Sequence, residues 1–107
     1  MNKYSKPRIL LVAMVDHISG ETAGESIEEL YEAGALKVQI MNSITKKGRP
    51  GYLYVIDCDD RSVDSVEETL VTKFGTTGWH RVQTEHRYTN EASRIVDRMI
   101  LEFISNT

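Results

Sequence analysis

The densest group of positive charge in this 107-residue sequence lies in one glycine-containing turn. Lys46, Lys47 and Arg49 place three cationic side chains within four residues. Gly48 and Gly51 lack a Cβ, so the backbone beside these cations can approach a ligand closely. Because ammonium and guanidinium groups bind phosphate oxygens, this segment predicts an anion-binding turn.

A second turn offers neutral groups that also bind anions. Its sequence, Gly-Thr-Thr-Gly at residues 75–78, supplies two hydroxyls and backbone N–H groups of the kind that surround a bound anion. The next predicted strand carries Arg81, which we expect to reach the same ligand. Together the two turns suit a polyphosphate. The candidate nucleotide-binding residues are Lys46, Lys47, Arg49, Thr76, Thr77 and Arg81.

Candidate ligands for a divalent cation follow a strongly apolar segment. Asp16 and His17 come directly after residues 9–15. Ser19 is expected to cap a helix whose first turn contains Glu21, and the N-terminus of that helix adds N–H donors and a partial positive charge. Since a polyphosphate normally carries a divalent cation, we predict Asp16, His17 and Glu21 as metal ligands.

Each of these groups also has an interpretation without a ligand. A basic turn is commonly a solvated surface loop, and two threonines between glycines are common where a helix ends. Asp16 and His17 also suit a turn that leads into a helix. The sequence contains no nucleophile–base pair and no glycine-rich dinucleotide fingerprint. The residues alone predict a small-anion or nucleotide-binding module without a defined reaction.

Two strongly apolar segments, residues 8–16 and 52–58, predict the central strands of a sheet. Between them we expect a helix that starts after Ser19 and ends at Gly34, and then a strand with one solvent-facing side over residues 36–45. The apolar residues of this first helix recur at helical spacing: Ala23, Ile27, Leu30 and Tyr31.

A second helix and a fourth strand complete the pattern. The inner face of that helix is Val63, Val66, Leu70 and Phe74, with Gly75 at its end. Residues 79–88 form a more polar strand, which suits a sheet edge. The order β-α-β-β-α-β predicts an α+β, ferredoxin-like sandwich with a four-stranded antiparallel sheet. We expect a single domain over residues 1–107, with its core in 8–88 and a polar lead-in over 1–7.

The predicted topology decides which loops meet. The end of the first strand, the start of the first helix, the basic turn and the Gly-Thr-Thr-Gly turn all fall at one end of the sheet. The candidate nucleotide-binding and metal-binding residues are therefore expected to line one shared pocket.

Residues 91–105 predict one more helix outside that core. Its apolar side chains recur at helical spacing: Ile95, Val96, Met99, Ile100, Phe103 and Ile104. Such a stripe must be covered by the open face of the sheet or by another subunit. A homo-oligomer is the expected assembly.

Composition limits the class of protein. Thirteen basic and sixteen acidic residues give a formal charge of −3, which argues against DNA or RNA as a partner. The longest apolar run, residues 9–15, is too short to cross a membrane, and the N-terminus shows no secretion signal. The only cysteine, Cys58, excludes an internal disulfide and is expected in the core. A cytoplasmic location is predicted.

Four ordered segments resemble the C-terminal domain of LarC, the nickel-insertion protein of nickel-pincer nucleotide cofactor biosynthesis. They are Asp-His-Ile-Ser-Gly-Glu at residues 16–21, EELYEAGAL at 28–36, KKGRPG at 46–51 and TTGWHR at 76–81. The fifteen-residue spacing from Glu21 to Leu36 matches the family pattern as well. The resemblance extends over residues 12–88.

This resemblance implies a CTP-dependent, metal-assisted step in which nickel enters a pyridinium dithiocarboxylate mononucleotide. Ni²⁺ would then be the substrate metal, and CTP with Mg²⁺ or Mn²⁺ the cofactor. The chain would be a nickel chelatase (cyclometallase) component that acts as an oligomer or with a separate N-terminal LarC-like protein. The basic turn, Thr77 and Arg81 match the family's nucleotide-binding segments, and Asp16 and Glu21 match its acidic segment.

The sequence departs from the family pattern at several positions. Met14 and His17 stand where the family has Asn and a second Asp, Gly20 replaces its Pro, and Thr45 replaces its hairpin Met. The change of Asp to His softens the metal-ligand set. These departures are typical of a stand-alone, divergent relative. The alternative is a non-enzymatic regulatory or assembly module that oligomerises through the C-terminal helix and the sheet.

Overall fold

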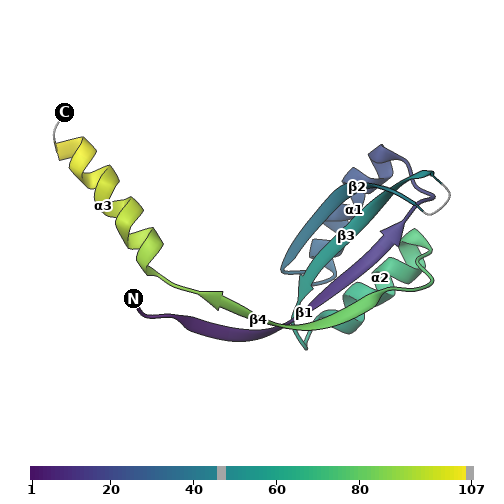
Figure 1. Cartoon of the computed structure of the whole chain (residues 1–107), viewed down its shortest axis with the longest axis horizontal. Coiled ribbons are helices and arrows are strands. Elements are labelled where there is room, and N and C mark those ends of the chain that lie inside the picture. Colours follow the sequence, from purple (N-terminus) through teal and green to yellow (C-terminus); the bar gives the residue numbers. More distant parts are fainter. Residues whose placement is uncertain (46–47, 106–107) are drawn as a thin grey trace.

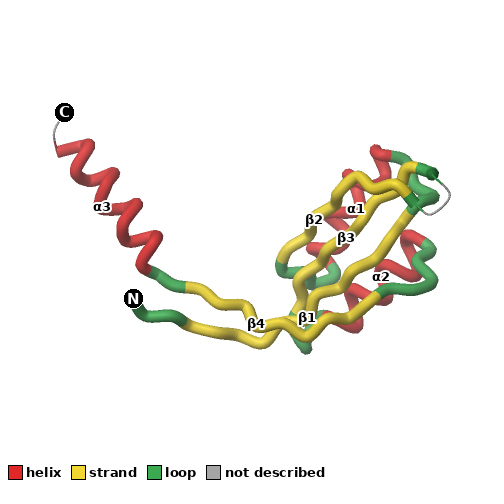
Figure 2. Tube along the Cα trace, in the orientation of Figure 1, coloured by secondary structure: helices red, strands yellow, loops and turns green. Residues whose placement is uncertain are grey.

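The computed structural model describes residues 1–45 and 48–105, with the backbone alone over 91–97. Figure 1 and Figure 2 show helices packed on one face of a sheet and the C-terminal helix set apart from it. In chain order the elements are β1 (Tyr4–Val15), α1 (Gly20–Glu32), β2 (Lys37–Ile44), β3 (Pro50–Cys58), α2 (Val63–Phe74), β4 (His80–Tyr88) and α3 (Glu91–Ser105).

The sheet has the strand order β2-β3-β1-β4, and every neighbouring pair is antiparallel. Helices α1 and α2 cover the same face of it (Figure 1). The predicted α+β ferredoxin-like fold is confirmed, with the two most apolar strands, β1 and β3, in the centre. A strand covered on one face and paired along both edges has little contact with water, which accounts for their composition.

The core lies between the sheet and the two helices. Alternate side chains of β1 and β3 point into it: Ile9, Leu11, Ala13, Val15, Tyr54, Ile56 and Cys58. The predicted inner face of α2 is buried throughout. Burial raises the pKa of the Cys58 thiol to about 12, so this side chain packs as an apolar group and not as a thiolate.

Helix α1 buries only part of the predicted face: Ala23 and Leu30 are buried as expected. Ile27 and Tyr31, which we expected to pack inward, are exposed, and Ser26 is fully buried instead. Ser26 Oγ donates to the Ala23 carbonyl oxygen at 2.6 Å and lies 2.8 Å from the Tyr54 hydroxyl. Because both hydroxyls find partners, a polar residue can occupy this core position.

The polar lead-in predicted over residues 1–7 is wrong for residues 4–7, which belong to β1. Beyond the end of β3, this part of β1 pairs only with β4, as a two-stranded ribbon that leaves the main sheet (Figure 2). The Tyr4 and Tyr88 rings stack at its tip with centroids 5.4 Å apart. Residues 4–7 show no alternation of apolar and polar side chains. This part of β1 is a strand because it pairs with β4, which is distant in the sequence.

Helix α3 continues from the ribbon and confirms the helix predicted over residues 91–105. Over residues 98–105, it packs against neither the sheet nor the other two helices (Figure 1). Its exposed apolar side chains include Met99, Ile100, Leu101 and Phe103. Among the described residues, no helix has the length and apolarity that crossing a bilayer requires.

Arg81 joins the edge strand β4 to α2. Its Nε donates to Glu67 Oε2 at 2.8 Å, and its Nη2 contacts both Glu67 Oε1 and Asp64 Oδ1. Trp79 Nε1 donates to the same Glu67 carboxylate. The hydrogen bond from Arg81 is the main reason that the pKa of Glu67 lies below its ordinary value, although partial burial opposes this shift.

The Ser26–Tyr54 pair predicts an asymmetry between two single substitutions. Ser26→Ala leaves the buried Tyr54 hydroxyl without a partner and should lower the free energy of unfolding by about 1–2 kcal/mol. Tyr54→Phe removes the hydroxyl itself, so the double variant should be more stable than Ser26→Ala alone. Urea denaturation checks this order. A double variant less stable than both single variants would contradict the buried bond.

The Arg81–Glu67 contact predicts a pH dependence. Because the pKa of Glu67 is lower in the folded state, its contribution to stability is present above the unfolded pKa and is lost as the pH falls through the folded pKa. Glu67→Gln should lower stability at pH 7 by about 1 kcal/mol and reduce the loss of stability between about pH 5 and pH 3. Urea denaturation at several pH values between about 5 and 3 tests this prediction. Glu68→Gln is the control, because the Glu68 side chain is exposed. Equal pH slopes in both variants would refute the contact.

Candidate functional site

Three loops meet at the end of the sheet where β1 finishes, and two glycines allow their close approach. A Cβ on Gly51, at the start of β3, would lie 3.4 Å from the Asp16 Cβ. A Cβ on Gly75, which ends α2 in the left-handed conformation, would lie 3.2 Å from His17 Nε2. The β1–α1 loop is thus in contact with both the β2–β3 hairpin and the α2–β4 turn.

The N-terminus of α1 opens at the same end. Ser19 caps the helix as predicted, because its Oγ accepts a hydrogen bond from the Thr22 N–H at 3.1 Å. The Tyr52 hydroxyl lies close to Gly20, where a Cβ would be 3.1 Å away. First-turn N–H groups and the helix dipole favour a negatively charged group here. Tyr52 and this helix end can therefore contact one ligand.

Asp16 and His17 form an open, polar pair. Asp16 Oδ1 lies 3.5 Å from His17 Nδ1, and about half of each side chain is exposed. The other ring nitrogen, Nε2, is 2.6 Å from the Phe74 carbonyl oxygen. The pair can present a carboxylate oxygen and an imidazole nitrogen to an ion from solvent.

The third predicted metal ligand, Glu21, is exposed in the first turn of α1. It does not complete a three-ligand group: among the described residues, no three or more His, Cys, Asp or Glu side chains are placed to hold one metal ion. An ion bound by Asp16 and His17 would take its remaining donors from water or from another ligand.

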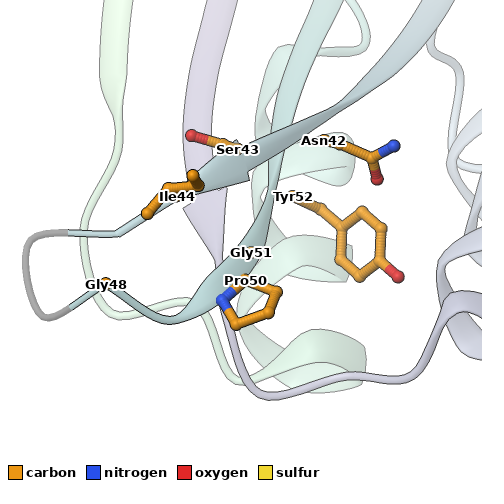
Figure 3. Close-up of a pocket in the computed structure, with 7 residues that line it drawn as sticks. All are labelled: Asn42, Ser43, Ile44, Gly48, Pro50, Gly51 and Tyr52. Atoms are coloured by element: carbon orange, nitrogen blue, oxygen red, sulfur yellow. The ribbon is translucent and has the colours of Figure 1, made fainter.

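A pocket of about 660 Å³ opens beside the β2–β3 hairpin (Figure 3). Asn42 and Tyr52 are paired across the two strands and project to the same side of them. Pro50 and Ile44, which is 78% exposed, add apolar surface. An apolar wall with one amide and one hydroxyl suits a planar ring with a polar edge.

The predicted basic residues lie on this hairpin. Arg49 is exposed, and its carbonyl oxygen accepts a hydrogen bond from the Thr45 N–H at 2.7 Å, which closes the turn. Lys46 and Lys47 lie outside the described residues. Arg49 is not itself a lining residue of the pocket, but it lies in the chain between two that are, Gly48 and Pro50.

The α2–β4 turn contributes fewer groups to this end than predicted. Thr77 is exposed there, but Thr76 is only 4% exposed, and its Oγ1 has no hydrogen-bond partner within the described part of the chain. Arg81 pairs in register with Leu11, well inside the sheet, and its guanidinium is held by α2. The structure therefore does not bring Arg81 to the loops around Asp16.

Neither Asn42 nor Tyr52 is among the site residues predicted from the sequence. Tyr52 does pack partly against the core, but it also lines the pocket. The sequence does hold one sign of Asn42 as a site residue. Val38 and Ile40 alternate as inward-facing apolar residues, and Asn42 is polar at the next position of that alternation. A polar residue at such a position indicates a site or an edge.

Comparison with known proteins adds independent information. A family model described as nickel insertion protein matches residues 2–101. A relative named for nickel insertion, from Methanothermobacter thermautotrophicus, is 38% identical over 93 residues, which cover 87% of this chain and 21% of the relative. A similarly named protein from Cyanothece sp. is 34% identical over 79 residues, which cover 74% of this chain and 19% of that relative. The chain spans about a fifth of the length of these relatives.

Solved structures share the fold. LarC2, the C-terminal domain of a cyclometallase involved in synthesis of the NPN cofactor of lactate racemase, superposes with a TM-score of 0.69 at 21% identity, over 80% of this chain and 58% of that one. A protein from Methanopyrus kandleri AV19 superposes with a TM-score of 0.68 at 27% identity, over 80% of this chain and 54% of that protein. The PII-like protein CPII from Thiomonas intermedia K12 superposes with a TM-score of 0.58 at 12% identity, over 79% of this chain and 99% of that protein.

These matches confirm the resemblance inferred from the four sequence segments. The family model extends over nearly all of the residues, and the LarC2 structure has the same sandwich. The chain belongs to the nickel insertion protein family.

Proposed function

We propose that this chain is a nucleotide- and metal-binding module of nickel insertion, with CTP and Mg²⁺ or Mn²⁺ as cofactors and Ni²⁺ as the substrate metal. The observation that carries the proposal is the meeting of three features at one end of the sheet. These are the Asp16–His17 pair, the N-terminus of α1 and the pocket beside the hairpin.

Phosphate oxygens fit the positive groups at this end. The first turn of α1 offers N–H donors and a partial positive charge, and the exposed Arg49 on the hairpin supplies a guanidinium. Lys46 and Lys47, adjacent in sequence, add two more cations, and Thr77 adds a hydroxyl. We assign the triphosphate to these groups.

The base fits the pocket beside the hairpin. Tyr52 and Pro50 present apolar surfaces to a flat ring, and the Asn42 amide can both donate and accept a hydrogen bond at its edge. CTP comes from the family resemblance, and these side chains are chemically compatible with a pyrimidine.

Of the three predicted metal ligands, we assign metal binding to Asp16 and His17, because Glu21 does not form a three-ligand group with them in the described part of the chain. Because the matched residues span only about a fifth of the curated relatives, we further propose that insertion uses residues outside this chain. A separate protein resembling the N-terminal part of LarC is one source of them.

A thermal-shift experiment tests the nucleotide site. CTP with Mn²⁺ at a hundredfold excess over its Kd should stabilise the chain by about 2.7 kcal/mol, enough to raise the melting temperature by several degrees. Arg49→Ala should remove most of this shift. Arg61→Ala is the control, because Arg61 is an exposed arginine next to the N-terminus of α2. No shift with any nucleotide, or equal loss in both variants, would overturn the assignment.

A second candidate function is assembly of a homo-oligomer, favoured by the exposed apolar side chains of α3. The ribbon separates α3 from its own sheet (Figure 1), and the open face of that sheet is itself partly apolar, with Met14, Met41 and Val82 exposed. We propose a second copy of this chain as the partner, with α3 of one copy covering the open sheet face of the other.

The oligomer is tested by sedimentation of the full chain and of two variants. Phe103→Asp places a charge on the apolar side of α3 and should convert the assembly to monomers, whereas Glu102→Lys, on an exposed neighbour, should leave it intact. Deletion of residues 91–107 should have the same effect as Phe103→Asp. A monomeric full-length chain would refute this candidate.

A further inference from the structure

The ring of His17 is held in one orientation from the interior side. Its Nε2 lies 2.6 Å from the Phe74 carbonyl oxygen. A carbonyl oxygen only accepts hydrogen bonds, so Nε2 must carry the hydrogen in this contact. In the neutral imidazole, the lone pair is then on Nδ1, the nitrogen that faces Asp16.

The carbonyl that holds this ring is the last one of α2. Phe74 ends the helix, and Gly75 follows it in the left-handed conformation, with φ 65°. The final carbonyl oxygens of a helix lack intrahelical donors and carry the negative end of its dipole, so they accept strongly from an N–H group. Because Phe74 is itself buried in the core, the position of its carbonyl is fixed.

We infer that Asp16 and His17 form a half-site for a transition-metal ion, bound by an Asp16 carboxylate oxygen and His17 Nδ1, with the Phe74 carbonyl positioning the ring. The inference rests on the proposed function and deepens it, since it assigns the pair to the Ni²⁺ cargo and not to the cation that accompanies the nucleotide. Histidine ligands in metal sites commonly donate their other N–H to a carbonyl in this way.

The donor types support that assignment. Imidazole nitrogen suits Ni²⁺ and its neighbours in the transition series, whereas Mg²⁺ prefers oxygen ligands alone. The 3.5 Å between Asp16 Oδ1 and His17 Nδ1 is close to the roughly 3 Å that separates adjacent donors on a metal with bonds of about 2.1 Å. A small side-chain rotation brings both onto one ion.

The described residues supply only two donors to this ion, and so small a ligand set fits a metal that must be handed on. Two protein donors leave most coordination positions to water or to the molecule that receives the ion, and both side chains are about half exposed. A site closed by four protein ligands would retain its metal as structural sites do. An open half-site allows exchange.

Metal titration of the full chain without nucleotide tests this assignment. Ni²⁺ binding, followed by calorimetry, should weaken more than about tenfold in His17→Ala and in Asp16→Asn. His80→Ala is the matched control, because His80 is an exposed histidine on β4, and it should leave the affinity unchanged. His17→Asp should lower Ni²⁺ affinity and raise that for Mg²⁺. Equal Ni²⁺ affinity in the native chain and His17→Ala would overturn the inference.

Nitrogen NMR of the native chain gives a second measurement that needs no variant. Long-range ¹H–¹⁵N spectra should show His17 as the Nε2–H tautomer, with Zn²⁺, a diamagnetic substitute, shifting the Nδ1 resonance and leaving His80 and His86 unchanged. An Nδ1–H tautomer, or a Zn²⁺ effect on Nε2, would refute the assignment.

The two proposals fail separately. If CTP stabilises the chain but Ni²⁺ affinity does not depend on His17, the nucleotide module stands and the half-site is wrong. If Ni²⁺ binds through His17 but no nucleotide raises the melting temperature, the half-site stands and the nucleotide module is wrong.

Discussion

The pairing of β1 with a neighbour on each side is the constraint on which the rest of the structure depends. Its ladder with β3 and β4 places Ile9 and Leu11 in the core, and it delivers Asp16 and His17 to the end where the hairpin and the α2–β4 turn lie. A slip of one residue in this register would turn the core residues to the open face. Fold stability and site geometry therefore depend on one set of backbone hydrogen bonds.

Binding and assembly are assigned to opposite ends of that strand. The end of β1 leads to the Asp16–His17 pair next to the β2–β3 hairpin, while its start forms the ribbon that leads to α3 (Figure 1). Helix α2 links core and site more directly, because Phe74 packs inside while its carbonyl holds the His17 ring. A core residue thus sets the orientation of the His17 ring, so changes in core packing around Phe74 should also move this side chain.

Local pattern was sufficient for most of the fold. The apolar runs marked β1 and β3 as central strands, helical spacing marked the inner face of α2, and Ser19 and Gly75 marked a helix start and a helix end. Topology also predicted which loops share one end, and with them the Asp16–His17 pair. These features follow from the period of the side chains and from the fixed handedness of the connections, both of which are properties of the chain itself.

Contacts between distant residues decided the remainder. Ser26 occupies a core position because the Tyr54 hydroxyl faces it, and Arg81 turns away from the pocket because Glu67 and Asp64 lie opposite. The sequence by itself determined the elements, their order and the loops that share one end of the sheet. Only the tertiary structure decided which polar groups meet there, because periodicity reports the side on which a residue lies and does not report the partner that folding places across from it.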